Sequence, residues 1–344
     1  MTTSEVPRAN PHKRATLADI AAAVDLHVST VSRVLNHDPN LSIRPETRDR
    51  ILHAAELQGY RPNAIARALK RARTGALAMV VPLLRNSIWS AIEGGALRYA
   101  REHGLVVLAI EEPEDEPRPA SHYQYLVEES RVDGLVIATA LRSSGKRGQL
   151  PIVPHVYMNR RGPRPGNDVV MDEEQAMALF VQHVSQLGHH RIGVVDGHTR
   201  IDTVYRRRAA LKQLCAAEGM TAFFEHEDHT EEGGYRATRR LLSRAHRPTA
   251  IGVGSLNQVF GAFKALREAG ASVPGDVSLV SFDEDECLAY LEVSVTSVSM
   301  PLESLGAAAV RALMDRVERR ISTDVMVSDP LRLIHRDSTA RAPR

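Results

Sequence analysis

The segment "TLADIAAAVDLHVSTVSRVLN", residues 16–36, constrains the fold more than any other part of the chain. Its first half places four apolar residues on one face of a helix that Thr16 can cap: Leu17, Ile20, Ala21 and Val24. After residues 25–27 the pattern restarts, with Val31, Val34 and Leu35 on one side of a second helix. Two short helices joined by a tight turn are typical of a helix-turn-helix, whose second helix enters the major groove of DNA.

The outward face of the second predicted helix carries short polar side chains and one guanidinium group: Ser29, Ser32, Arg33 and Asn36. Short side chains let a helix approach base edges closely, and an arginine can bind guanine or phosphate. The alternative interpretation is an ordinary amphipathic helical hairpin with a solvated face.

Residues 42–60 predict a third helix that is capped by Ser42 or Thr47 and stops at Gly59. Its predicted buried residues are Ile51, Leu52 and Ala55. Three helices of this kind form a minimal DNA-binding domain.

Residues 61–73, "RPNAIARALKRAR", contain five basic residues and no acidic ones. Pro62 interrupts the chain, and Asn63 can cap a new short helix. A helix this short is not stable alone in water, so we expect it to order against DNA or a second copy of itself. A solvated linker is the alternative.

From Thr74 onward, apolar runs alternate with helical patterns. The predicted strands lie within residues 76–84, 105–112, 133–140, 155–159, 191–197, 250–255 and 277–284. Continuous Val, Ile and Leu runs predict strands buried on both faces of parallel α/β sheets. The strands are too many for one compact sheet, and residues 160–168 interrupt the series, so we expect two lobes with a ligand-binding cleft at the carboxyl ends of the strands.

Composition limits the function classes. The net charge of +2 is nearly neutral over 344 residues, so a nucleic-acid surface has to come from the basic first 73 residues. No apolar run is long enough to span a membrane, and no apolar signal segment opens the chain, so a cytoplasmic location is expected. The sequence lacks phosphate-binding loops, a dinucleotide fingerprint and a nucleophile elbow, so neither an enzyme nor a cofactor is predicted.

Histidines and cysteines give no metal site. Residues 226–229, "HEDH", would point to opposite faces of an extended segment, and residues 188–192, "GHHRI", are expected to form a turn. Cys215 and Cys287 are widely spaced, and we expect reduced thiols there rather than a disulfide or metal ligands.

At this point the chain resembles the LacI/GalR (lactose-repressor-type) family of transcription regulators over nearly its whole length. The matching motifs are the segment 16–36, the hinge "GYRPNAIARAL", and the core motifs "LGHHRIGVVDG", "VPGDVSLVSFDED" and "LGAAAVRALMDR". The resemblance implies a headpiece at 14–60, a hinge helix at 61–74 and a periplasmic-binding-protein-like core at 75–344. The expected lobes of that core are residues 75–165 plus 300–335, and 166–299.

The resemblance also assigns DNA contacts. Val28 and Ser29 match the pair that reads bases, and Arg33 matches a base or phosphate contact. Leu69 matches the hinge leucine that is wedged into the minor groove, with packing between two hinge helices as the alternative. Further implied contacts are Thr16, His27, Thr30, Ser32, Asn36, Asn63 and Ala66. The family usually has Gly-Val-Ser where this chain has residues 25–27, Asp-Leu-His.

Implied effector contacts are Trp89, Asn159, Arg207, His229, Ser255, Leu256 and Asp283. Where the family commonly carries Asn-Asp, this chain has Ser255-Leu256, which removes an acidic group that grips sugar hydroxyls. We therefore expect Arg207 to lack a nearby counter-charge and to favour a carboxylate or phosphate over a neutral hexose. Candidate effectors are a sugar derivative, a sugar acid, a phosphorylated metabolite or a purine-like ligand. A core role for Trp89 and a solvated helix face for Arg207 are the alternatives.

The predicted function is a homodimeric repressor that binds a pseudo-palindromic DNA operator and is switched by a small molecule between the lobes. The alternatives are a two-lobed solute-binding protein without DNA-dependent regulation and an enzyme acting in the cleft. The basic headpiece argues against the first, and the missing nucleophile and base argue against the second. No heptad repeat follows the core, which favours a dimer over a tetramer.

Overall fold

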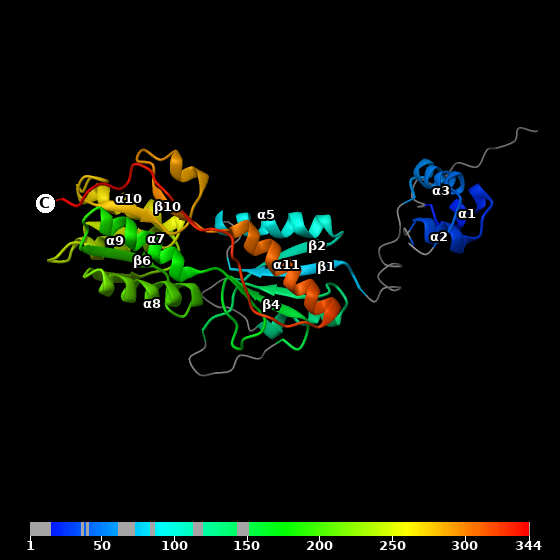
Figure 1. The fold of residues 1–344 in the computed structure, drawn as a ribbon, viewed down its shortest axis with the longest axis horizontal. Helices are drawn as coiled ribbons and strands as arrows, with labels where there is room; N and C mark the ends of the chain where they lie inside the picture. Colours follow the sequence, from blue (N-terminus) through cyan, green and yellow to red (C-terminus); the bar gives the residue numbers. More distant parts are fainter. Residues whose placement is uncertain are drawn as a thin grey trace, which may run out of the picture. The chain divides into compact units, whose positions relative to one another are not determined.

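The computed structural model describes residues 15–35, 38, 41–60, 73–82, 87–112, 120–142 and 151–343. The chain divides into two compact units, residues 1–74 and 75–344 (Figure 1). The predicted DNA contacts at Asn36, Asn63, Ala66 and Leu69 lie outside the described residues.

The described residues of the first unit form three helices: α1 (Leu17–Val24), α2 (Val28–Leu35) and α3 (Pro45–Leu57). Thr16 caps α1 as predicted, because its hydroxyl accepts from the Asp19 amide and the Asp19 carboxylate accepts from the Thr16 amide. Asp25 ends α1 in the left-handed conformation, with φ of 52°. The three helices share a core of Ile20, Ala21, Val24, Val31, Val34, Ile51 and Ala55. The predicted helix-turn-helix is confirmed.

The prediction for α3 is wrong in two details. The helix begins at Pro45, with Arg44 rather than Ser42 or Thr47 at the N-cap, because the fixed φ of proline suits the first helical position. Leu52 is 40% exposed, since a residue next to the buried Ile51 lies about 100° away around the helix.

The second unit contains two six-stranded sheets, with strand orders β11-β5-β4-β3-β1-β2 and β12-β10-β9-β8-β6-β7. The first sheet comprises β1 (Ala76–Val81), β2 (Val106–Glu111), β3 (Leu135–Ile137), β4 (His155–Met158), β5 (Asp168–Val170) and β11 (Val325–Met326). The second comprises β6 (Arg191–Asp196), β7 (Thr221–His226), β8 (Ala250–Val253), β9 (Ser278–Ser281), β10 (Thr296–Ser299) and β12 (Arg332–Ile334). Among these described strands every pair is parallel except β10 with β12.

Each sheet and its helices form one lobe (Figure 1). The first lobe holds α5 (Ser87–Glu102), η1 (Ala120–Tyr123), α6 (Tyr125–Glu128) and α11 (Leu302–Arg319). The second holds α7 (Glu173–Gln186), α8 (Asp202–Ala217), α9 (Glu231–Leu242), α10 (Leu256–Glu268) and η2 (Glu286–Ala289). Helices α5 and α11 touch backbone to backbone, because a Cβ on Gly95 would lie 1.9 Å from the Glu303 carbonyl oxygen.

All seven predicted strands form, but the expectation of burial on both faces is wrong for β2. Among the described strands it lies at a sheet edge and pairs with β1 alone, so Val106 is 57% and Leu108 45% exposed. The prediction missed β5, β7, β10, β11 and β12.

Residues beyond β12 are fastened to the second lobe. The Ser338 hydroxyl donates to the Leu279 carbonyl (2.5 Å) and accepts from the Thr296 amide (2.8 Å). The Ala342 amide donates to the Leu187 carbonyl (2.9 Å). This segment is therefore part of the lobe rather than a loose tail.

Candidate DNA interface and effector cleft

Helix α2 presents the face that a DNA-reading helix needs. Val31 and Val34 are buried against the other two helices, whereas Val28 is 40% exposed and Ser29 and Arg33 are exposed. The side chains expected to approach bases therefore reach solvent.

His27 supports the start of α2. The Ser29 amide donates to Nδ1 of His27 (3.2 Å), and the Ser29 hydroxyl lies 2.7 Å from the same nitrogen. The imidazole thus satisfies an amide that the first turn of a helix leaves without an intrahelical partner.

The side chain of Arg33, in α2, is held by an ion pair. Its Nε donates to the Asp38 carboxylate at 2.8 Å, and both side chains are partly exposed, at 44% and 29%. An exposed pair of this kind contributes little stability, so the exchange of Asp38 for a DNA phosphate costs little. Arg50 has a structural role, because its guanidinium donates to the carbonyl of Val24 at the end of α1 (2.9 Å).

In the second unit, Arg207 of α8 lies in a buried charge cluster. Its Nε donates to Oε2 of Glu173 (2.7 Å), one terminal nitrogen donates to the Gly254 carbonyl (3.1 Å), and Asp283 lies 3.9 Å from the other. The side chains of Arg207 and Glu173 are 9% and 1% exposed. The expectation that Arg207 lacks a counter-charge, and the alternative that it lies on a solvated face, are both wrong.

The sequence did not predict Glu173 as a site residue, because an acidic residue in the first turn of a helix is ordinarily explained by the helix dipole. Here it begins α7 and points inward instead of to solvent. Its second oxygen, Oε1, is buried and accepts no hydrogen bond from the described residues, and lies 4.0 Å from Arg206.

His229 joins the same cluster through Asp196, with 3.2 Å between its Nε2 and the Asp196 carboxylate. Burial acts to raise the pKa of Asp196, but the hydrogen bond with His229 and the charge of Arg207 bring that pKa below its ordinary value. Burial raises the pKa of Asp283 to about 6, against the lowering effects of Arg207 and His229. Asp196 is therefore the more strongly ionised of the two carboxylates.

The other predicted effector residues are dispersed. Trp89 is 2% exposed and packs in the hydrophobic core, as its alternative interpretation states. Asn159 has a φ of 65°, and its carbonyl accepts from Arg206 (3.2 Å). Ser255 caps α10, and Leu256 is buried.

A cavity of about 330 Å³ lies where the two lobes meet. Its lining residues are Leu141, Arg142, Arg161, Gly162, Pro163, Asp202, Tyr205 and Arg206. They come from the loops after β3 and β4 and from the start of α8, which are carboxyl ends of parallel strands and the usual place for a ligand. None of the seven predicted effector residues lines this cavity. Sequence reasoning missed it because the loop residues follow no periodic pattern.

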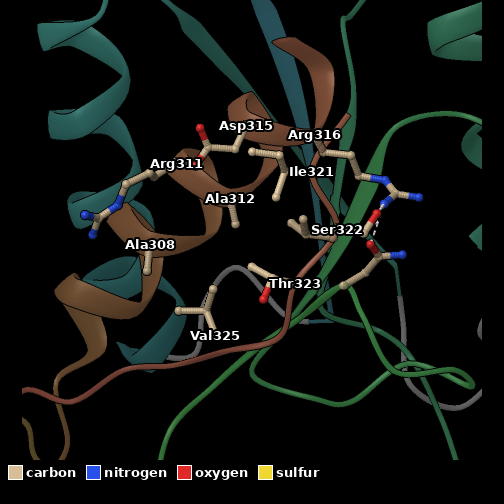
Figure 2. A pocket seen from close by; sticks show the side chains of 11 residues that line it. Ala308, Arg311, Ala312, Asp315, Arg316, Ile321, Ser322, Thr323 and Val325 are labelled. Carbon is tan, nitrogen blue, oxygen red and sulfur yellow. Dashed lines mark hydrogen bonds between the residues drawn. The ribbon is translucent and has the colours of Figure 1, made fainter. Parts of the chain in front are cut away.

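A second cavity, of about 280 Å³, lies between α11 and strands β4 and β11 of the first lobe. Figure 2 shows Ala308, Ala312 and Val325 around it. Arg316 at its edge donates to the Asn167 side chain (2.6 Å) and to Ser322.

Of the four histidines considered as metal ligands, His189, His226 and His229 make hydrogen bonds within the protein. His189 is buried, with its two ring nitrogens 2.9 Å from the Thr249 hydroxyl and 3.1 Å from the Ser278 hydroxyl. Within the described ranges, no three His, Cys, Asp or Glu side chains come close enough together to hold a metal ion. No helix of the described part of the chain could cross a membrane.

Comparison with known proteins agrees with this geometry. Residues 16–63 match the lacI family of bacterial regulatory proteins, and residues 181–339 match the periplasmic binding protein-like domain. The HTH-type transcriptional regulator reg1 of Streptomyces lividans is 32% identical over 355 residues, which cover 95% of this chain and 97% of reg1. The chain belongs to the lacI family.

This lacI-family regulator is also 26% identical over 347 residues to the HTH-type transcriptional repressor PurR of Klebsiella pneumoniae (strain 342), covering 96% of this chain and 98% of PurR. The crystal structure of the lac repressor dimer bound to operator and the anti-inducer ONPF shares the fold, with a TM-score of 0.79 at 22% identity over 95% of this chain and all of that one. The predicted family, fold class and function as a transcriptional regulator are confirmed, and these relatives are regulators rather than enzymes.

Proposed function

We propose that this lacI-family regulator is a repressor, and that it binds a pseudo-palindromic operator as a homodimer. A small molecule in the cleft between the lobes changes its operator affinity. The observation that carries the proposal is the exposed face of α2, presented by a helix-turn-helix on the same chain as a two-lobed core with a cavity at the lobe junction. Repression is supported by the name of the relative PurR.

The proposed base contacts are Val28, Ser29 and Arg33. The exposed Val28 can meet a thymine methyl group, Ser29 can donate or accept a hydrogen bond, and Arg33 can bind guanine or phosphate. The remaining DNA contacts of the proposal are Thr16, His27, Thr30, Ser32, Asn36, Asn63, Ala66 and Leu69.

A homodimer is supported by apolar side chains that this chain leaves in solvent. In the first lobe, Leu97 of α5 is 49% exposed, and the edge strand β2 exposes Val106 and Leu108. In the second lobe, Phe260 of α10 is 38% exposed. Helices α5 and α10 both lie along the upper side of the core in Figure 1. Large exposed apolar side chains on an edge strand and its neighbouring helix are typical of an interface, and twofold symmetry of the protein requires a twofold operator.

Effector contacts are supported by position in the sheets. Asn159 follows β4, Ser255 follows β8 and Asp283 follows β9, all at carboxyl ends of strands, and Arg207 and His229 belong to the cluster around Asp283. A ligand carboxylate on Arg207 is not part of the proposal, because Glu173 already compensates that guanidinium.

Selection of bound sequences from random DNA with the full-length protein tests the proposal. We expect enrichment of an inverted repeat, and a fragment that begins at Thr74 should enrich nothing while it still binds effector. Enrichment of a single asymmetric site, or the same enrichment with the fragment, contradicts the proposal.

A further inference from the structure

We infer that the cavity at the lobe junction is an anion site, in which Arg142 and Arg161 bind a phosphate or carboxylate group of the effector. The inference rests on the proposed function, since it names the chemistry of the effector. The anion would therefore bind to the loops that follow β3 and β4, and not to Arg207.

The cavity lining contains three arginines and one carboxylate: Arg142, Arg161, Arg206 and Asp202. Arg206 donates to the Asp202 carboxylate (2.9 Å) and to the carbonyls of Met171 (3.0 Å) and Asn159 (3.2 Å). Asp202 and Arg206 therefore compensate one another. In the part of the chain that the structure describes, no carboxylate lies within ion-pair distance of Arg142 or Arg161. Burial raises the pKa of Asp168 and the charge of Arg161 acts to lower it, so a carboxylate lies near Arg161. Neither guanidinium group, however, forms an ion pair with a described residue.

Arg142 is already positioned for a ligand. Its guanidinium lies 3.1 Å from the centroid of the Tyr205 ring, and its backbone amide donates to the Arg200 carbonyl (2.8 Å). Stacking on an aromatic ring fixes the guanidinium plane and leaves the N–H groups at its edge to bind an anion, so less side-chain entropy is lost on binding.

The place of the cavity connects binding to regulation. Leu141 of the first lobe and Ile201 of the second form an antiparallel bridge beside it. A ligand between Arg142, Arg161 and Tyr205 therefore contacts both lobes, and its affinity depends on how they are arranged, which is the condition for shifting a conformational equilibrium. A volume of about 330 Å³ is within the range of small-molecule sites.

The cavity in Figure 2 does not offer the same chemistry. Its lining combines the apolar Ala308, Ala312 and Val325 with Arg311 and the Asp315 carboxylate, which adds a negative charge. Arg316 at its edge is already hydrogen-bonded to Asn167 and Ser322.

Calorimetric titration of the full-length protein in about 150 mM KCl, near physiological ionic strength, tests the site. The probes are inorganic phosphate, malonate, glucose 6-phosphate, gluconate and glucose, so that phosphate, carboxylate and neutral ligands are separated. We expect one anionic class to bind, and Arg142→Ala and Arg161→Ala each to weaken it by about tenfold or more, as loss of a charge-assisted hydrogen bond implies. Arg267→Ala, at an exposed arginine in the last turn of α10, is the matched control and should bind like the wild type.

The anion site is wrong if the wild type and both variants bind the anionic probes with equal affinity, or if none of them binds. It is also wrong if glucose binds as tightly as glucose 6-phosphate. Arg161→Ala leaves the Tyr205 contact intact, so the test holds even if Arg142→Ala disturbs the fold. Operator affinity without probes, measured on the same samples, keeps the two proposals apart. If the wild type does not bind operator, the proposed function is wrong. If it binds operator but no anion, only the anion site is wrong.

Discussion

Glu173 and Arg207 form an ion pair from which water is almost excluded, at 2.7 Å and with 1% and 9% of the side chains exposed. Removal of one partner from such a pair leaves a buried charge without compensation. We expect Glu173→Ala to lower the free energy of unfolding of the core by about 3 to 5 kcal/mol. Urea unfolding measures this, because Trp89 is the only tryptophan of the chain and is buried in the core.

The double variant Glu173→Gln, Arg207→Met removes both charges and should recover most of this loss, since an apolar replacement of a buried pair is often tolerated. Glu268→Gln is the control, because Glu268 forms an exposed pair with Lys264 and should unfold like the wild type. Equal stability of Glu173→Ala and the wild type would contradict the assigned role.

For single residues, the sequence predicted several members of the buried charge cluster. It did not predict which side chain neutralises the charge of Arg207. The resemblance pointed to Arg207, His229 and Asp283, and the structure brings them into one cluster. Glu173 lies 34 residues before Arg207, and only the packing of α7 against α8 brings the two together. No local pattern contains that information.

Among the elements, α2 depends on its first turn, because the His27 imidazole accepts from the Ser29 amide. We expect His27→Ala to weaken α2 by about 1 kcal/mol, and His27→Asn to restore the loss, since asparagine is a good N-cap. Hydrogen–deuterium exchange of α2 in the full-length protein is the measurement. His53→Ala, at an exposed histidine of α3, should leave that exchange unchanged. If exchange of α2 were the same in His27→Ala and the wild type, the capping role would be wrong.

Strand prediction succeeded where apolar residues are continuous and failed where burial is polar. Strand β10 contains Thr296 and Ser297, which are fully buried. The Thr296 amide donates to Ser338, 42 residues further along the chain, and so the strand is satisfied by a partner that its own sequence does not show. Strands β5, β11 and β12 have only two or three residues, too few for a recognisable period.

In the whole molecule, we expect the exposed edge strand β2 to form part of the dimer interface. We expect Val106→Glu to shift the protein from dimer to monomer in sedimentation velocity, because a charge would be placed in an apolar interface. Operator affinity should fall with it, since each monomer carries only one headpiece. Ile152→Glu replaces an apolar residue that is 90% exposed and serves as the control. A dimer of unchanged stability in Val106→Glu would place the interface elsewhere.

The position of the strands beyond residue 300 also affects how the chain folds while it is being translated. Strand β11 borders β5 in the first sheet, and β12 borders β10 in the second, so both sheets take an edge from this late segment. A ribosome that stalls before residue 325 therefore leaves a nascent chain with β5 and β10 as open edges, and open edges promote aggregation. Neither lobe can reach its final form during translation until this segment has emerged, so the two lobes complete their folding together rather than one after the other.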